Sequence, residues 1–272
     1  MGKHILLVND LPGYGKVALA AMLPVLSHLG HHVYNLPTAL VSNTLDYGKF
    51  DILETTGYMK NTIRVWEELG FSFDAVATGF IVSEAQSELV GAYCRTQRER
   101  GACIFVDPIM GDEGHLYNGV PDSTVAAMRR LVSGADYIVP NYTEAALLTE
   151  TPYRDEGTGE EEMRQIIDSL RRIGASSVVV TSARVNGQDA VAGYDAKRDS
   201  YFLHPFTAIP VRFPGTGDIF SSVLLGHVMN GEPLPFSVQK AMDAVAVLIG
   251  RNRNNADTFK GIPLETCLEV LR

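Results

Sequence analysis

The chain has 272 residues, 46% of them hydrophobic and 20% charged, and its formal net charge is −9. This length and composition suffice for one sizeable hydrophobic core. An acidic surface repels nucleic-acid phosphates and anionic lipid, so no partnership with nucleic acid or with a membrane surface is expected.

The first half of the chain alternates short apolar runs with longer amphipathic segments. Ser83 has the position of a helix N-cap, with Glu84 and Glu88 in the first turns that follow. The periodicity of apolar residues predicts strands at 4–8, 32–36, 75–78 and 103–106, and helices at 17–29, 61–69 and 83–100.

The second half continues this alternation until two short runs, 189–194 and 200–204, which have the pattern of an antiparallel hairpin. The remaining segments are predicted as strands at 137–139 and 178–181, and as helices at 122–131, 143–149, 160–173, 218–229, 237–249 and 264–271. We therefore predict one α/β domain over residues 1–272. It should have a mostly parallel central sheet, helices on both faces and an antiparallel hairpin at one edge.

Polar or glycine residues follow most of the predicted strands. In open α/β sheets, ligands bind beyond the carboxyl ends of the strands, so these residues are candidates for a site. They are Asn9-Asp10, Gly79-Phe80, Asp107, Asn141 and Thr181-Ser182.

The run Gly215-Thr216-Gly217-Asp218 comes directly before an apolar helical segment. Glycines let backbone N–H groups approach a phosphate, and a helix N-terminus favours anions. Asp218 is placed to accept a proton from an attacking hydroxyl. An ordinary glycine-rich loop whose acidic residue satisfies the helix end explains the same four residues. A Walker-type GxxxxGK[ST] loop is absent from the sequence.

The surrounding stretch, FPGTGDIFSSVLLG, resembles the signature of ribokinase-like small-molecule kinases. In that family the aspartate is the catalytic base and the glycine amides form an anion hole. The resemblance therefore implies a ribokinase-like fold, with Asp218, Gly215 and Gly217 as catalytic residues and Thr216 beside the nucleotide.

Two further stretches agree with the same family. VDPIMGD at 106–112 resembles the VDPVMGD segment of vitamin kinases related to pyridoxal kinase, and PNYTE at 140–144 resembles the PNxxE motif. The resemblance implies that Asp107 and Glu144 organise Mg²⁺, with Asp112 on the same side. By the same resemblance, Asn141 lies near the nucleotide phosphates and Thr181-Ser182 contacts ATP. Simple strand ending at Asp107 and helix capping at Asn141 and Glu144 are the alternatives.

On the substrate side, LPTALVSNTLDYG at 36–48 resembles the pyridoxal-kinase stretch in which a Ser-Asn pair precedes residues that touch the pyridine ring. The corresponding residues here are Thr44, Leu45 and Asp46. Thr78-Gly79-Phe80 resembles the TGY that lines the same pocket. The resemblance is to the pyridoxal/pyridoxamine kinase branch of the superfamily, and it covers nearly the whole chain.

Three positions depart from that pattern. Asp10 replaces the serine that usually contacts the substrate, Leu45 stands in place of a threonine, and Phe80 replaces the pocket tyrosine. A buried carboxylate needs a partner, so Asp10 would favour a ligand with a hydroxyl donor or a cationic amine. A carboxylate bonded to nearby loop amides is the alternative at this position.

The resemblance implies transfer of the ATP γ-phosphoryl group to the 5′-hydroxymethyl group of pyridoxal, pyridoxamine or pyridoxine. It also implies Mg²⁺, a monovalent cation near the phosphate loop, and a homodimer. One rival is a kinase for hydroxymethylpyrimidine, the thiamin precursor, on the same fold. The other is a non-catalytic vitamin-binding protein that has kept the fold.

Location is suggested by two features of the sequence. The three cysteines lack CxxC or metal-ligand spacing, which favours reduced thiols. The apolar segment that begins at His4 lacks the layout of a secretory signal. We therefore expect a cytoplasmic protein.

Overall fold

The structure is a computed structural model that describes residues 2–117 and 119–271. The chain forms two compact units. The first comprises residues up to Gly79 together with those from Ile209 onward, and the second comprises Phe80–Ala208. Among the described residues, no helix combines the length and the apolar character needed to cross a bilayer.

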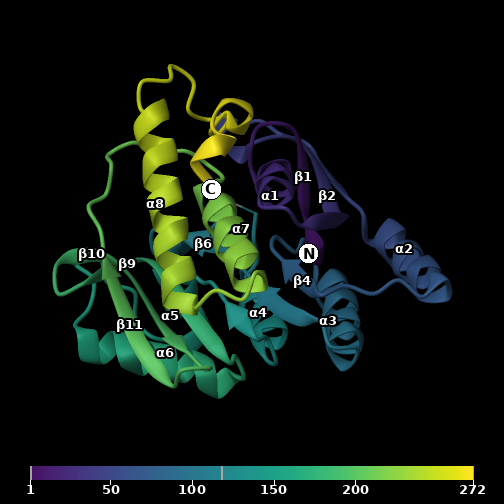
Figure 1. Cartoon of the computed structure of the whole chain (residues 1–272), viewed down its shortest axis with the longest axis horizontal. Helices are drawn as coiled ribbons and strands as arrows, with labels where there is room; N and C mark the ends of the chain where they lie inside the picture. The colour runs from purple at the N-terminus through teal and green to yellow at the C-terminus, as the bar shows by residue number, and fades with distance from the viewer. Residues whose placement is uncertain (1, 118, 272) are drawn as a thin grey trace. The chain divides into compact units, whose positions relative to one another are not determined.

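The first unit is built on strands in the order β4-β1-β2-β3. β1 is parallel to β2 and to β4, whereas β3 is antiparallel to β2. Helices α7 and α8 lie side by side in this unit, and α1 packs on β1 and on α7 (Figure 1). Its elements are β1 His4–Tyr14, α1 Ala18–His28, β2 His32–Asn43, η1 Leu45–Tyr47, β3 Ile52–Glu54, α2 Thr56–Leu69, β4 Ala75–Thr78, α7 Thr216–Met229, α8 Leu234–Asn252, η2 Leu264–Thr266 and η3 Leu268–Leu271.

The second unit contains strands in the order β11-β10-β9-β8-β5. β5, β8 and β9 are parallel, and β10 then runs antiparallel to both β9 and β11. Helix α6 packs on β9 and β10 (Figure 1). The elements are α3 Glu84–Glu99, β5 Cys103–Val106, β6 Gly111–Asp112, β7 His115–Leu116, α4 Ser123–Val132, β8 Tyr137–Ile138, α5 Tyr142–Thr149, α6 Glu160–Ile173, β9 Ser177–Val185, β10 Gln188–Asp195 and β11 Ser200–Pro205.

Continuous apolar runs explain why the central strands are buried. Ile5, Leu6 and Leu7 of β1 are fully buried, as are Val178–Val180 of β9. Burial of each such side chain stabilises the fold by about 1.5–3 kcal/mol. Strands buried on both faces are typical of parallel sheets covered by helices.

Local signals account for where several helices begin and end. Ser83 caps α3, because its hydroxyl accepts a hydrogen bond from the Gln86 N–H at 3.3 Å. Helix α6 has three acidic residues in its first turn and Arg171 and Arg172 in its last turn, and it is followed by Gly174. These charges complement the helix dipole at both ends.

The predicted α/β fold, with a mostly parallel sheet and an antiparallel hairpin, is confirmed. One predicted helix is wrong: residues 264–271 form the short 3₁₀ segments η2 and η3 instead of an α-helix. The five residues from Pro263 to Cys267 close through 3₁₀-type bonds, from Thr266 N to Pro263 O and from Cys267 N to Leu264 O.

β1, β2 and β9 continue well beyond their predicted ends, and in β1 and β9 the extension carries candidate site residues. β1 runs through Asn9 and Asp10 to Tyr14, with a register shift against β2 between Asn9 and Leu11. β9 runs through Thr181 and Ser182 to Val185, with a register shift opposite these two residues on β10. Bulges of this kind re-aim side chains and are common beside functional sites.

Candidate active site

Asp218 lies in the first turn of α7, three residues after the left-handed N-cap Gly215. Its Oδ2 accepts a hydrogen bond from the backbone N–H of Ala18 at 2.8 Å, and its Oδ1 accepts one from the Asn9 side-chain amide at 3.4 Å. Ala18 has a positive φ of 46°, which costs free energy for a non-glycine residue and is often found at functional sites. The carboxylate is therefore held in a fixed orientation at the helix N-terminus.

Asp10 lies close enough to Asp218 for the two carboxyls to repel each other. Burial, and next the charge of Asp218, raise the pKa of Asp10 from its ordinary 3.8 to about 7. Burial also raises the pKa of Asp218, to about 6, against the lowering effect of the bonds from Ala18 and Asn9. The structure thus brings two of the predicted residues into one pair of carboxyls that titrate near neutral pH.

The segment that carries the other predicted substrate residues contacts the C-terminal loop 255–262. The Thr44 hydroxyl donates to the Phe259 carbonyl at 2.6 Å, and the Tyr47 hydroxyl donates to Asp257 at 2.7 Å. Leu45 and Asp46 lie between these two anchors, and the Leu45 side chain is exposed. The contact of Thr44, Leu45 and Asp46 with a substrate remains a prediction.

In the second unit, Glu144 is the centre of the candidate metal and phosphate cluster. Its Oε1 accepts from the Met110 N–H at 3.0 Å and its Oε2 from the Asn141 N–H at 2.9 Å. Asn141 in turn accepts from the Glu144 N–H at 2.9 Å and donates to the Gly111 carbonyl at 2.8 Å. Asn141 and Glu144 form a capping box for α5, so helix capping is present and fixes both side chains.

The charge of this cluster suits a divalent cation. Burial, and then the nearby carboxylate of Asp107, raise the pKa of Glu144 well above its ordinary value. A cation close to two such carboxylates would remove their mutual repulsion. No group of three or more potential His, Cys, Asp or Glu ligands occurs among the described residues. Mg²⁺ fits such a set, because it keeps several waters and takes phosphate oxygens beside one or two carboxylates.

Three further residues predicted on the nucleotide side, together with Phe80 of the predicted substrate pocket, lie in the second unit. Thr181 forms a parallel bridge with Asn141, and its N–H donates to the Pro140 carbonyl at 2.9 Å. Ser182 is exposed and has a positive φ of 51°. Asp112 ends β6 and accepts from the Glu113 N–H at 2.9 Å, whereas Phe80 is the first residue of this unit and is half-buried.

Sequence reasoning missed two groups that hold Asp218. Asn9 was recognised only as a polar residue after a strand, although its side chain is 1% exposed and its amide contacts the carboxylate. Ala18 acts through its backbone N–H, which no side-chain pattern can reveal. The glycine at position 79 leaves room for the Asn9 side chain, because a Cβ there would lie 2.4 Å from the Asn9 amide nitrogen. This glycine was therefore an indirect sign in the sequence that Asn9 points toward the site.

The raised pKa of Asp10 predicts a pH-dependent effect of Asp10→Asn on stability. The folded-state pKa of about 7 exceeds the ordinary 3.8, so the native carboxyl favours the protonated form and stability is lost as the pH rises from about 4 through 7. Asparagine cannot ionise. We therefore expect Asp10→Asn to raise the melting temperature at pH 8 by roughly 2–4 °C, the shift that about 1 kcal/mol produces in a domain of this size.

Thermal melts of wild type and Asp10→Asn at pH 4 and pH 8 measure this difference. Asp155→Asn, which removes one charge at an exposed position, serves as the matched control and should show no such pH dependence. A shift of equal size at both pH values would mean that Asp10 does not carry a buried charge.

Comparison with known proteins places most of the chain in one family. The sequence profile of the phosphomethylpyrimidine kinase family matches residues 19–261. A pyridoxal kinase of Rubrobacter xylanophilus is 26% identical, over 91% of this chain and 87% of its own length. A pyridoxine/pyridoxal/pyridoxamine kinase of Bordetella avium is 29% identical, over 93% of this chain and 91% of its own.

Solved structures agree with these sequence relatives. A Bacteroides thetaiotaomicron protein assigned as a phosphomethylpyrimidine kinase, crystallised with pyridoxal, is 34% identical with a TM-score of 0.94, over 100% of this chain and 96% of its own. Pyridoxal kinase from Lactobacillus plantarum is 29% identical with a TM-score of 0.88, over 99% and 96% of the two chains. The chain belongs to the phosphomethylpyrimidine kinase family, in the pyridoxal kinase branch of the ribokinase-like superfamily.

Proposed function

We propose that this chain is an ATP-dependent kinase that phosphorylates the 5′-hydroxymethyl group of pyridoxal, pyridoxamine or pyridoxine. The observation that carries the proposal is the Asp218 carboxylate, fixed by Ala18 and Asn9 at the N-terminus of α7, with its pKa raised to about 6. A base with a pKa near the working pH suits removal of an alcohol proton. The Bacteroides thetaiotaomicron protein that was crystallised with pyridoxal supports the substrate class.

In the proposed reaction, the substrate alcohol oxygen bonds to the γ-phosphorus of ATP while the bond from that phosphorus to the ADP oxygen breaks. Asp218 takes the alcohol proton. The N–H groups of Gly215–Asp218, at the positive end of α7, stabilise the negative charge on the transferring group. Positioning and electrostatic stabilisation supply most of the rate, and the base supplies the smaller share.

On the nucleotide side, we assign Asp107 and Glu144 to Mg²⁺, with Asp112 beside them. When bound, Mg²⁺ would neutralise charge on the ATP phosphates. The capping box fixes Glu144 before any ligand arrives, so no ordering of this side chain is needed on binding. Asn141, Thr181, Ser182 and Thr216 remain proposed nucleotide contacts, and a monovalent cation near the phosphate loop remains part of the proposal.

Asp10 is the proposed residue that selects the substrate. With a pKa of about 7, its carboxyl can accept a hydrogen bond from a hydroxyl or pair with a protonated ring nitrogen or amine. Vitamin B6 compounds carry such groups around a pyridine ring. The hydroxymethylpyrimidine of thiamin synthesis carries an amine and is the rival substrate for the same base.

A steady-state screen with Mg-ATP separates these functions. Pyridoxal, pyridoxamine, pyridoxine and hydroxymethylpyrimidine would each be tested, with and without EDTA. We expect turnover of at least one B6 compound, a kcat/KM for it that exceeds that for the pyrimidine, and loss of activity with EDTA.

Two other results would overturn the proposal. A higher kcat/KM for the pyrimidine would assign the chain to thiamin synthesis. Binding of a B6 compound without turnover of any of the four substrates would support a non-catalytic vitamin-binding protein.

We further propose that the chain acts as one domain over residues 1–272, as a homodimer in the cytoplasm. The comparison structures match the chain over nearly its full length, which supports one functional domain. β3 is the outermost strand of the first unit, and Leu53 on it is 61% exposed, an apolar edge that a second subunit would cover. The three free cysteines suit a reducing compartment.

A further inference from the structure

A cavity lies in the second unit, at the amino ends of three parallel strands. It has a volume of about 500 Å³, and residues at or beside the starts of β5, β8 and β9 line it: Cys103, Tyr137 and Ser177. The predicted nucleotide residues Asp107, Asn141 and Thr181 come four residues later on the same three chain segments. The cavity therefore lies at the amino ends of these strands, whereas the predicted nucleotide residues lie toward their carboxyl ends.

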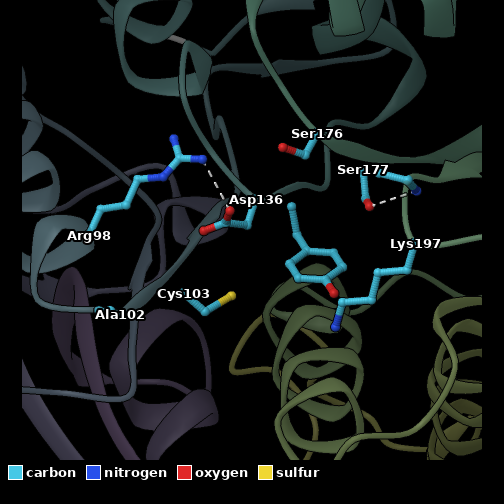
Figure 2. A pocket seen from close by; sticks show the side chains of 10 residues that line it. Arg98, Ala102, Cys103, Asp136, Ser176, Ser177 and Lys197 are labelled. Atoms are coloured by element: carbon cyan, nitrogen blue, oxygen red, sulfur yellow. Dashed lines mark hydrogen bonds and ion pairs between the residues drawn. The ribbon is translucent and has the colours of Figure 1, made fainter.

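Two cationic side chains border the cavity. Figure 2 shows Arg98 and Lys197 on opposite sides of it, with Asp136 and Ser176 between them. Arg98 pairs with Asp136 at 3.3 Å, so its charge is balanced within the cavity wall. Asp136 is itself fixed, because its Oδ2 accepts from the Ile104 N–H at 2.8 Å.

Lys197 supplies the positive charge that Asp136 does not balance. The nearby Tyr137 side chain raises the pKa of the ammonium group, so Lys197 stays charged at neutral pH. The nearby Asp195 is buried, where it accepts from the Lys197 backbone N–H at 3.0 Å and lies 3.7 Å from the Arg198 guanidinium.

The cavity wall is suited to binding and not to covalent chemistry. Burial raises the pKa of the Cys103 thiol to about 12, so it is protonated at neutral pH and is a poor nucleophile. Small residues, Gly101, Ala102 and Ala196, leave the space between the two cations open. The Ser177 hydroxyl accepts from the Ala196 N–H at 3.1 Å, which ties the β10–β11 turn that carries Lys197 to the start of β9.

We propose that this cavity binds a small organic anion, a phosphate monoester or a carboxylate, which Lys197 holds from one side and the Arg98–Asp136 pair from the other. The Ser176 hydroxyl supplies a neutral donor between them. The site is separate from the phosphate-transfer residues and does not depend on the proposed kinase reaction. It lies on an otherwise acidic protein, where a local cationic excess concentrates anions.

Backbone amide NMR on ¹⁵N-labelled full-length protein tests the proposal and separates this cavity from the phosphate loop. The protein would be titrated with inorganic phosphate, glycerol 3-phosphate and succinate, each against sodium chloride at matched ionic strength. We expect saturable shifts of the Ala102, Cys103 and Ala196 amides. A response to the phosphates alone or to succinate alone would identify which anion the site prefers.

Two variants at neighbouring positions of one turn give the matched comparison. Lys197→Gln should raise the Kd read from these amides about tenfold, the effect of losing one charge-assisted hydrogen bond. Arg198→Gln removes the same charge but pairs with Asp195 outside the cavity lining, so its Kd should stay within about twofold, well short of the roughly tenfold step. Absence of saturable shifts, or equal Kd values for wild type and Lys197→Gln, would overturn the proposal.

Discussion

We expect Asp218→Asn to lower kcat by roughly 10²–10⁴, the range for lost acid–base catalysis, while ATP binding is largely retained. The asparagine side chain can still accept the hydrogen bond from Ala18, so the local structure should persist. It cannot take the alcohol proton. Steady-state kinetics with the best B6 substrate and calorimetric titration with ATP measure the two effects separately.

The pH profile gives this prediction a second, independent readout. The base must be ionised to act, so kcat/KM of the wild type should fall as the pH decreases through about 6 to 7, the range given by the pKa values of Asp218 and Asp10. Because the two carboxyls interact, the fall in kcat/KM at low pH (the acidic limb of the profile) reflects the titration of both groups together. In Asp218→Asn the limb near 6 should disappear.

The exposed Asp243 on α8 offers a matched control, because Asp243→Asn makes the same chemical change in the same unit away from the site. Its kinetics should equal those of the wild type. Near-normal turnover by Asp218→Asn, with an unchanged acidic limb, would remove Asp218 from the role of base.

The alternating pattern of the sequence was enough to predict the fold, because continuous apolar runs in short segments leave few arrangements other than a covered parallel sheet. The length of the strands was predicted less well than their order. Asn9-Asp10 and Thr181-Ser182 were interpreted as strand ends, since polar pairs break an apolar run. In the structure both strands continue past a register shift, where β1 stays paired with β2 and β9 stays paired with β10, and this pairing keeps the backbone extended.

The candidate site, too, could be predicted from the sequence only in part. Side chains in recognisable motifs, such as Asp218 and Glu144, could be selected from the sequence. The groups that orient them could not, because the N–H of Ala18 and the N–H of Met110 are backbone donors set by tertiary structure. The two interpretations of Glu144 were both open from the sequence. The structure shows the capping box, which is compatible with metal binding because each carboxylate oxygen has a second lone pair.

The phosphate loop supplies the other large expected effect. Gly215 is the N-cap of α7 with a φ of 84°, a conformation that residues with a Cβ rarely adopt. A Cβ at this position would lie 2.3 Å from the Lys16 carbonyl oxygen, so the loop or the β1–α1 segment would have to move. We expect Gly215→Ala to lower the free energy of unfolding by roughly 1–3 kcal/mol. Displaced amide donors should also reduce kcat by about 10²–10³.

Gly217→Ala is the comparison that isolates the backbone effect, since both changes add one methyl group to the same loop. Gly217 lies within the first turn of α7, and a Cβ there would meet nothing within 4 Å. Alanine also favours a helix over glycine by about 1 kcal/mol, so Gly217→Ala should melt at or above the wild-type temperature. Thermal melts and kinetics of both variants test this. If Gly215→Ala kept the wild-type melting temperature and kcat, the left-handed turn would not be what positions the anion-binding amides of α7.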